Sequence, residues 1–262
     1  MSIAHTFAGE NMKRCLQMII REEAIATHFQ PIVDLHDETI FGFEVLSRTT
    51  FPLLRPVDLF HAAEDQNLSW ELESACSMAA FRRIAALPPD QQGKSFFINI
   101  SPRCIADPRP VRGFAASSME ALTIERFRIV IEVTETCRIG DYPSFSERMR
   151  QYEEGGHRIA LDDFGSGYSG LLTLVALAPQ FIKIDKALVR GVDSRPYQQK
   201  LIRALAGFAA SVGCVVIAEG IERVEEKRVV ADLGVAYGQG FFFAAPSVDP
   251  PALAGQRVAC IF

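Results

Sequence analysis

The chain lacks the charge pattern of a protein that coats nucleic acid. It has 27 Lys and Arg residues against 32 Asp and Glu residues, a net charge of -5, and no long cluster of cations. Binding a nucleic-acid polymer through its phosphates normally requires a basic surface. We therefore expect no nucleic-acid polymer as a partner, and any anionic ligand must be held at a local site by a metal ion or a few cations.

The six cysteines lack the spacing of a metal site. There is no Cys-x-x-Cys pair and no Cys/His cluster, and the thiols are scattered along the chain: Cys15, Cys76, Cys104, Cys137, Cys214 and Cys260. Most lie in apolar runs, which is typical of small core residues in a reducing compartment. The cysteines therefore argue against a zinc site and favour a cytoplasmic location.

Long hydrophobic runs are also absent. No stretch approaches the roughly 18 to 20 uncharged apolar residues of a membrane-spanning helix. The short apolar run at residues 15–20 ends in Arg21-Glu22-Glu23 without a small-residue cleavage site, so we expect neither a signal peptide nor a membrane span. Residues 1–23 are predicted to form a helical lead-in to one domain at residues 24–262.

Apolar residues make up 48% of the 262-residue chain, enough for one large core or two small ones. Two segments rich in β-branched and aromatic residues, 24–35 and 39–47, are joined by a short polar turn and are predicted to pair as a hairpin. Six more strands are predicted at residues 96–100, 127–133, 157–161, 181–184, 214–218 and 237–243. Helices are predicted at residues 56–64, 70–87, 114–122, 142–154, 170–177, 196–212 and 224–233, with an irregular stretch at 102–110.

Eight strands, of which the last six alternate with helices, favour a (β/α)8 barrel over an open doubly wound sheet, although strand count does not exclude the sheet. Uninterrupted apolar runs at residues 129–131 and 215–217 suit strands that are covered on both faces. Two consecutive strands without a helix between them must be antiparallel. The predicted fold is an α/β modified (β/α)8 TIM-type barrel with an initial antiparallel hairpin.

Polar residues interrupt apolar runs at the ends of the predicted strands. They are Glu44, Asn99, Glu132, Asp162 with Asp163, Lys183, Glu219 and Gln239. In a barrel these strand ends meet at one rim, which is where active sites lie. Each residue alone has an ordinary explanation, such as a solvated carboxylate, a turn-forming asparagine, a surface ion pair or a bulge. The repetition from strand to strand favours one shared site.

Asp162 and Asp163 are the centre of this pattern. Two adjacent carboxylates at a buried strand end are unfavourable unless a cation offsets them, although Asp162 capping the following turn beside a solvated Asp163 is an alternative. The polar residues at the strand ends offer oxygen ligands without imidazole or thiolate, which suits Mg²⁺ or Mn²⁺. They have more donors than one ion needs, and two ions about 3.5 to 4 Å apart are the usual clamp for displacement at phosphorus. Lys183 would then polarise or deprotonate the attacking water, or stabilise charge on the phosphorane.

The motifs resemble, in order, those of the EAL family of cyclic di-GMP phosphodiesterases. The matching segments are residues 29–34 (FQPIVD), 43–48 (FEVLSR), 98–101 (INIS), 131–135 (IEVTE), 162–167 (DDFGSG), 182–185 (IKID), 218–222 (AEGIE) and 237–240 (YGQG). The resemblance covers about residues 25–246. It implies metal-dependent hydrolysis of cyclic di-GMP to linear pGpG by a cytoplasmic homodimer, with two Mg²⁺ or Mn²⁺ ions and with Ca²⁺ as an inhibitory stand-in.

The resemblance also implies residue roles. One metal would be held by Glu44, Asn99, Glu132 and Asp162, and the second by Asp162, Asp163 and Glu219. Lys183 would contact the attacking water and Gln239 would bind water in the metal shell. Supporting roles fall to Glu135, which would hold the loop at residues 163–169 for the second metal and the dimer, and to Glu222. The substrate would be lined by Gln30, Leu46, Arg48 and Pro246, with Arg48 able to pair two phosphate oxygens.

Two departures from the family pattern leave alternatives open. Val45 stands where alanine is usual in the name-giving triplet, and the segment at residues 49–56 is shorter and less polar than usual. Valine fits a strand, although a larger side chain can strain a packed site. The alternatives to an active enzyme are a cyclic di-GMP receptor with weak or no catalysis and a protein-interaction module. No sensory, diguanylate-cyclase or receiver pattern is present to indicate an input signal.

Overall fold

The computed structural model describes residues 3–50, 55–107, 109, 124–134, 142–167 and 170–250, with side chains described from residue 11 onward. The predicted helix at 114–122 and Glu135 lie outside the described residues.

The eight strands close into one barrel in chain order. They are β1 (Ile25–Asp34), β2 (Ile40–Thr49), β3 (Ser95–Asn99), β4 (Ile129–Thr134), β5 (Arg158–Phe164), β6 (Phe181–Ile184), β7 (Val215–Ala218) and β8 (Tyr237–Gly238). β1 pairs antiparallel with both β2 and β8, and the neighbours from β2 to β8 pair in parallel. The predicted modified barrel with an antiparallel hairpin is therefore confirmed.

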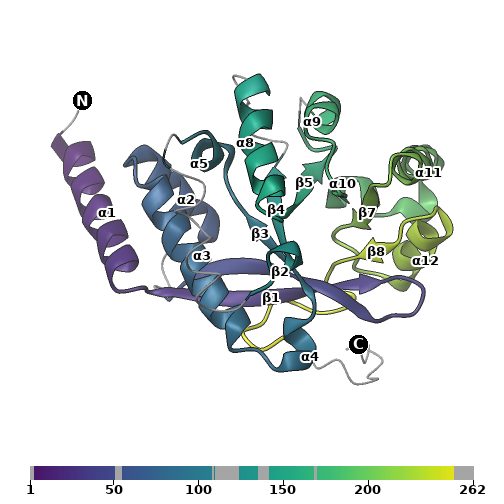
Figure 1. The fold of residues 1–262 in the computed structure, drawn as a ribbon, viewed down its shortest axis with the longest axis horizontal. Helices are drawn as coiled ribbons and strands as arrows, with labels where there is room; N and C mark the ends of the chain where they lie inside the picture. The colour runs from purple at the N-terminus through teal and green to yellow at the C-terminus, as the bar shows by residue number, and fades with distance from the viewer. Residues whose placement is uncertain are drawn as a thin grey trace.

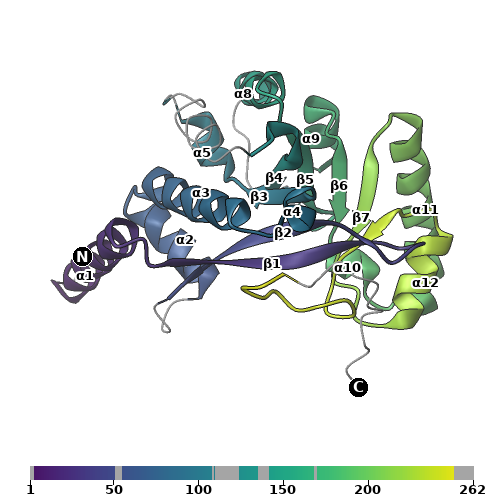
Figure 2. The same cartoon turned by 60° about the horizontal axis from the view of Figure 1, so that its bottom comes forward.

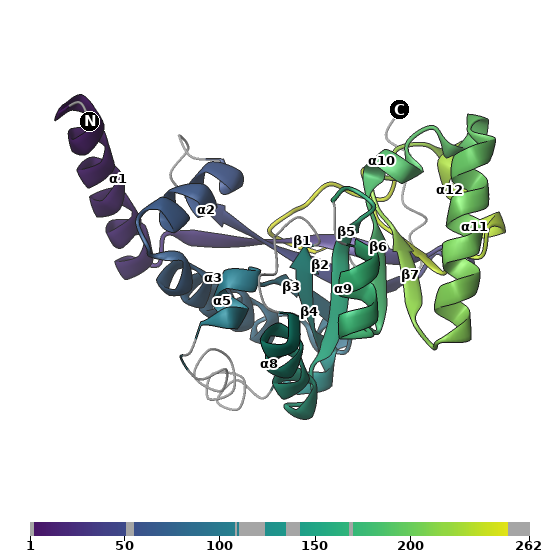
Figure 3. The same cartoon turned by 90° about the horizontal axis from the view of Figure 1, so that it is seen from above.

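The long β1–β2 hairpin runs across the molecule from the side of α1 to the side of α12, as Figures 1 and 2 show. At its tip, Glu38 forms an ion pair with Lys227 of α12. The helices are α1 (Ile3–Arg21), α2 (Pro56–Asp65), α3 (Ser69–Ala85), α4 (Pro89–Gln92), α5 (Pro102–Ala106), α8 (Tyr142–Glu154), α9 (Gly170–Leu177), α10 (Lys186–Val189), α11 (Pro196–Ser211) and α12 (Val224–Asp232). Seen from above in Figure 3, α1 and α11 lie at opposite ends of the molecule.

The lead-in helix α1 packs on α2 and α3. Leu16 and Ile19 of α1 are fully buried in a cluster with Leu59 of α2 and Leu72 of α3. Burial of apolar side chains of this size stabilises the contact by about 1.5 to 3 kcal/mol each. The division of the chain at residue 23 stays a prediction.

No helix in the described part of the chain is both long and apolar enough to cross a membrane.

The two-residue period of a strand places the polar site directly above an apolar layer. Inside the barrel, Val130, Phe181 and Ile217 belong to one buried cluster. Two residues further along the same strands stand Glu132, Lys183 and, just past the end of β7, Glu219. The residues between them, such as Ile131 and Ile182, face the helices in two other clusters. Phe41, Phe97, Phe181 and Tyr237 close the layer with ring contacts.

The structure corrects three boundaries. β8 ends at Gly238, although residues 237–243 were predicted as a strand, because the chain turns there to pair with the loop after β7. Ile221 N donates to Gln239 O at 3.0 Å and Phe242 N donates to Ile221 O at 3.0 Å, so these backbone groups leave the strand ladder. The stretch after β3, predicted as irregular, contains α5, whose first turn is capped by Ser101 Oγ accepting from Cys104 N. α4 was not predicted; it follows the helix that was predicted to end at residue 87, and it begins with proline.

Candidate metal and active site

Four carboxylates from different parts of the barrel converge on one ammonium group. Lys183 Nζ on β6 lies 2.7 Å from Glu132 Oε1, 2.8 Å from Glu219 Oε1, 3.1 Å from Asp162 Oδ1 and 3.6 Å from Glu44 Oε2. The Lys183 side chain is fully buried. The strand ends that were expected to meet at one rim therefore do bring these five side chains together.

Two amide side chains tie this cluster across the barrel. Asn99 Nδ2 on β3 donates to Glu44 Oε1 and to Glu132 Oε2, both at 3.2 Å. Gln239 Nε2 donates to Glu44 Oε2 and, at 2.9 Å, to Gln30 Oε1. Glu44 is thus held by amides on both sides, which fixes its carboxylate at the rim.

Asp163 lies next to the cluster in an unusual backbone conformation. Its φ is +54°, a left-handed value that costs a non-glycine residue about 1 kcal/mol or more. This conformation lets Asp163 follow Asp162 without pointing away, because neighbouring strand residues would otherwise face opposite sides. Asp162, Asp163 and Glu219 each bring one oxygen within 4.8 Å of the others. Thr134 Oγ1 donates to Asp163 Oδ2 at 3.4 Å.

The carboxylates of the described cluster outnumber its one cation, Lys183, and this excess adds to the pKa shifts of some of them. Burial raises the pKa of Glu219 to about 8 and that of Glu132 well above its ordinary value, and in both cases nearby carboxylates add to the shift while Lys183 opposes it. Burial and Asp162 raise the pKa of Asp163 to about 6. Burial alone would lower the pKa of Lys183, but the surrounding carboxylates raise it well above its ordinary value. A hard cation at this rim would relieve the excess negative charge.

A cavity of about 450 Å³ opens beside the cluster. Its inner wall includes Asn99, Asp162 and Asp163, and its outer wall comes from α2 and α3, with His61, Glu64 and Cys76 among the lining residues. A volume of this size is typical of a small-molecule site. The carboxylate cluster therefore has a space in which a ligand can reach it.

Two of the four predicted substrate-lining residues line this cavity, namely Leu46 and Arg48. Arg48 is partly buried, which lowers its pKa, and its Nη1 donates to Ser47 O at 2.9 Å. Gln30 instead lies between Gln239 and the backbone carbonyl of Ala244, to which its Nε2 donates at 3.1 Å. Pro246 is half-buried beside the bridge between Phe29 and Ser247 and is not among the cavity-lining residues of the described chain.

Glu222 lies apart from the cluster. It is exposed, and its Oε2 lies 3.5 Å from Arg190 Nη2. No described contact joins Glu222 to the metal site, so its supporting role stays a prediction. Glu135 lies outside the described residues.

Sequence reasoning missed Glu73 of α3. This carboxylate is 6% exposed, lines the cavity, and accepts from Ser101 N at 3.0 Å at the start of α5. Burial raises its pKa, while hydrogen bonds from Ser101 oppose the rise. The sequence could have indicated the burial of Glu73, because this carboxylate falls on the same helix face as Leu72, Cys76 and Ala80, which are apolar and buried. Glu73 fixes the turn that follows Asn99.

A model of the EAL domain family matches residues 13–246. Over 245 residues the chain is 30% identical to the cyclic di-GMP phosphodiesterase PdeR of Escherichia coli K12, a match that covers 92% of this chain and 36% of PdeR. The chain therefore spans about a third of the length of that relative.

Solved structures agree with this match. BlrP1 of Klebsiella pneumoniae in its calcium and cyclic di-GMP complex has a TM-score of 0.78 and 29% identity over 86% of this chain and 56% of that one. Its manganese complex with the same nucleotide gives a TM-score of 0.77, at 29% identity and the same coverage. A standalone EAL protein of Vibrio cholerae O395, bound to c-di-GMP, has a TM-score of 0.78 and 25% identity over 88% of this chain and 96% of that one.

Proposed function

This chain belongs to the EAL domain family, and from that premise we propose that it is a metal-dependent phosphodiesterase that hydrolyses cyclic di-GMP to linear pGpG. The observation that carries the proposal is the convergence of Glu44, Glu132, Asp162 and Glu219 on Lys183, beside a ligand-sized cavity that Asp162 lines. The relative PdeR carries this activity in its name, and the BlrP1 and Vibrio structures hold the same nucleotide.

The donor set fits two hard divalent cations, and we assign them as Mg²⁺ or Mn²⁺. The described cluster supplies carboxylate and amide oxygens without imidazole or thiolate. Glu44, Asn99, Glu132 and Asp162 would hold one ion, and Asp162, Asp163 and Glu219 the other. When bound, such ions neutralise phosphate charge and make water a stronger nucleophile. Ca²⁺ prefers longer bonds and a looser geometry, so we expect it to support binding and to inhibit turnover.

The protein's own groups orient the reaction. Lys183 has a raised pKa and stays an ammonium group among its carboxylates, so it acts as a donor that orients the attacking water and stabilises charge on the phosphoryl oxygens. Gln239 and Asn99 hold Glu44 in place. Arg48 lines the cavity, and we assign to it the pairing of two phosphate oxygens of the nucleotide. Leu46, Gln30 and Pro246 complete the proposed substrate lining.

We also assign a second copy of this chain as a partner. α9 follows the loop after β5, and its Leu171, Leu172 and Val175 are 69%, 68% and 79% exposed. Three large apolar side chains on one short helix favour a covered face. A homodimer through α9 would cover this face and place a second chain near the end of β5, which carries Asp163.

A cytoplasmic location and a domain that begins at residue 24 are part of the same proposal. Cys15, Cys76, Cys104 and Cys214 are free thiols, which suits a reducing compartment. The raised pKa of Cys76 and Cys104, about 12 in each case through burial, makes these two thiols unreactive.

The test is the product. Purified protein is incubated with cyclic di-GMP and Mn²⁺, and the nucleotides are separated by liquid chromatography with mass detection. We expect pGpG to accumulate. A protein that binds cyclic di-GMP in Ca²⁺ but makes no pGpG in Mn²⁺ would be a receptor, and one that binds no nucleotide would be an interaction module.

A further inference from the structure

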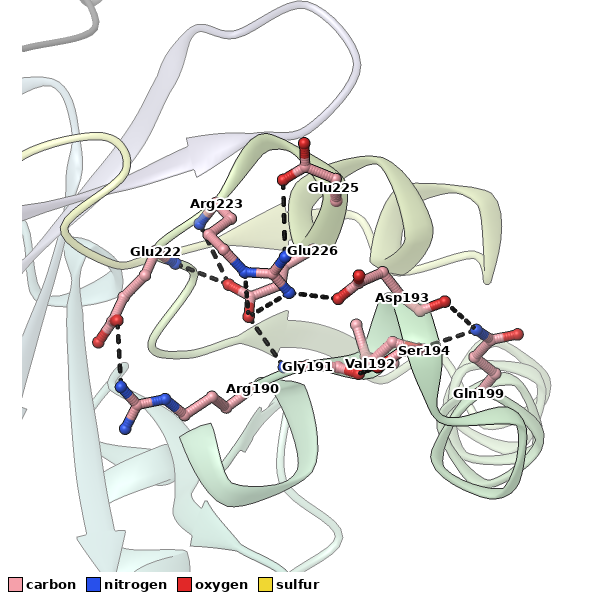
Figure 4. A network of polar contacts seen from close by, with 10 residues as sticks. All are labelled: Arg190, Gly191, Val192, Asp193, Ser194, Gln199, Glu222, Arg223, Glu225 and Glu226. Carbon is pink, nitrogen blue, oxygen red and sulfur yellow. Dashed lines mark hydrogen bonds and ion pairs between the residues drawn. The ribbon is translucent and has the colours of Figure 1, made fainter. Parts of the chain in front are cut away.

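A second polar network lies between the chain connections that leave β6 and β7 (Figure 4). At its centre is Glu226, in the first turn of α12, which is 1% exposed. Glu226 Oε2 accepts from the backbone N–H groups of Glu222 at 3.0 Å and Arg223 at 3.1 Å. Glu226 Oε1 accepts from Gly191 N at 2.8 Å. One buried carboxylate therefore contacts two separate segments of backbone.

The charge of Glu226 is matched within the network. Arg223 Nε and Nη2 lie 3.3 and 3.2 Å from Glu226 Oε1, and Arg223 Nη2 also pairs with Asp193. Burial alone would raise the pKa of Glu226, but the backbone hydrogen bonds and Arg223 lower it below its ordinary value. The carboxylate is therefore ionised, and charge-assisted hydrogen bonds of this kind are about twice as strong as neutral ones.

The two backbone segments are those that follow the strands of the metal site. β6 carries Lys183 and continues through α10 to Gly191, and β7 leads to Glu219 and then to Arg223. The connections also touch directly, because a Cβ at Gly220 would lie 2.4 Å from Lys186 Cβ. Gly191 itself has a φ of +70°, which favours glycine and directs its N–H to Glu226.

We propose that Glu226 is a positioning residue that clamps the connection after β6 to the connection after β7, and so fixes the Glu219 carboxylate relative to Lys183. The inference deepens the proposed function, on which its kinetic readout rests. The distance that the clamp sets is the 2.8 Å between Lys183 Nζ and Glu219 Oε1. Small displacements of such groups are costly in catalysis and in metal binding.

The clamp goes beyond ordinary helix capping. A glutamate or glutamine three residues after the cap often accepts from the cap N–H, and Glu226 does this with Oε2. Its other oxygen reaches Gly191, which belongs to a different connection. Glutamine has one oxygen and one donor NH₂, so it can keep the cap or the link to Gly191 but not both. Glu226→Gln therefore breaks at least one of the two contacts with little change in volume.

The control is Glu225→Gln. This substitution removes the same charge from an exposed position. The Glu225 carboxylate lies 3.8 Å from the same arginine, but none of the described hydrogen bonds joins it to the backbone of either connection. Both variants and the wild type are compared at a temperature where circular dichroism shows each to be folded. Hydrogen–deuterium exchange is followed in segments 186–195 and 219–223, and Mn²⁺ affinity is measured by calorimetry.

For Glu226→Gln we expect faster exchange in both segments, Mn²⁺ affinity weakened by about tenfold, and a kcat reduced by about tenfold with KM within about twofold. Glu225→Gln should match the wild type in every readout. If Glu226→Gln does not fold, Glu226→Asp, which keeps the charge but is one methylene shorter, takes its place with the same expected directions.

Wild-type exchange and Mn²⁺ affinity in a folded Glu226→Gln protein would overturn the clamp. Lower thermal stability with unchanged Mn²⁺ affinity would also overturn it, since a purely structural cap would give that result. Exchange and Mn²⁺ binding need no hydrolysis. A wild-type protein that makes no pGpG would therefore refute the proposed function and leave the clamp to be decided by these two measurements.

Discussion

Lys183 Nζ on β6 lies 2.8 Å from Oε1 of Glu219, which follows β7. The same ammonium also contacts Glu132 of β4 and Asp162 of β5, which lie on the opposite side of β6. Because β6 stands between β5 and β7 in the barrel, its lysine is the one cation in this described cluster that neighbours from both sides can reach. A single ammonium cannot neutralise Glu44, Glu132, Asp162, Asp163 and Glu219 together. The site is therefore built to accept further positive charge.

Glu44→Ala should abolish turnover. Glu44 is 8% exposed and is held by Asn99 and Gln239, so its removal deletes a proposed metal ligand and takes one of two acceptors from each amide. We expect kcat/KM to fall by at least about 100-fold. Residues that only support a metal ligand lose up to about that much activity when they are replaced, and Glu44 is proposed as a ligand itself. The assay is pGpG formation in saturating Mn²⁺, with Glu22→Ala, an exposed carboxylate after α1, as the control. An undiminished rate would refute the ligand assignment.

Lys183→Ala should separate binding from hydrolysis. The ammonium is proposed to act on the attacking water and the developing charge, so we expect cyclic di-GMP affinity in Ca²⁺ to stay within about threefold while turnover in Mn²⁺ falls by about 100-fold or more. Removing one partner of a buried ion pair costs about 3 to 5 kcal/mol, so the metal-free variant should also be less stable. Equal losses of binding and turnover would mean that Lys183 has a structural role.

Metal binding should become tighter as pH rises toward 8. Burial raises the pKa of Glu219 to about 8, against about 4.3 in an unfolded chain. Between these values the folded protein holds a proton that the unfolded chain has released, so Glu219 lowers the stability of the metal-free protein as pH rises through this window. A bound ion needs the ionised carboxylate and must displace that proton.

Calorimetry of Mn²⁺ binding at pH 6.5, in two buffers of different ionisation enthalpy, measures the released proton. Glu219→Gln should show a smaller release and a flatter dependence of metal-free stability on pH. No proton release from the wild type at pH 6.5 would contradict the raised pKa.

His157 should contribute to the loss of folding stability at acidic pH. Burial and, to a lesser degree, Arg126 lower the pKa of His157 to about 4, against about 6.5 in an unfolded chain. Between these values the unfolded chain binds a proton that the folded protein does not. The free energy of unfolding therefore falls as pH drops from 6.5 to 4, with a contribution from His157 of up to about 1.4 kcal/mol per pH unit.

Urea unfolding of His157→Gln across this range should show a shallower fall than the wild type. His36→Gln, at an exposed position in the hairpin turn, should retain the wild-type slope. The same slope in His157→Gln and in the wild type would show that His157 titrates normally.

Leu172→Glu should weaken self-association. Leu172 is 68% exposed on α9, and a carboxylate there would have to be buried without a partner in the proposed dimer. Light scattering after size exclusion should give a dimer for the wild type and a monomer for the variant. Val248→Glu, at another exposed apolar position, should remain dimeric. A wild-type monomer at the highest concentration tested would reject the dimer.

The sequence was a good guide where strands were short, apolar and ended in a polar residue. Such runs predicted the positions of β4, β6 and β7, and the polar residues that end them met at one rim as expected. The resemblance of ordered motifs to the EAL family is confirmed by the family match. Alternation in a strand is a local property, so it can be read from neighbouring residues.

What the sequence could not supply were contacts made between distant segments. Residues 241–243 have strand-like composition, but they form a turn in which Phe242 N donates to Ile221 O and Phe243 N donates to Gly240 O. Glu73 and Glu226 read as ordinary helix carboxylates, and only the fold brings them to Ser101 and Gly191. The contact of Gln30 with Gln239 likewise depends on the pairing of β1 with β8, which are far apart in the sequence. The predicted role of Gln30 in lining the substrate stays a prediction.

The central claim is that the gathered carboxylates act by holding divalent cations, and the most direct test is the metal dependence of pGpG formation. Protein stripped with chelator is assayed alone and during titration with Mn²⁺, beside Glu44→Ala. The account predicts no pGpG without metal, recovery of turnover as about two Mn²⁺ bind per chain, and no recovery in the variant. Full turnover in the presence of excess chelator, or equal recovery in Glu44→Ala, would contradict it.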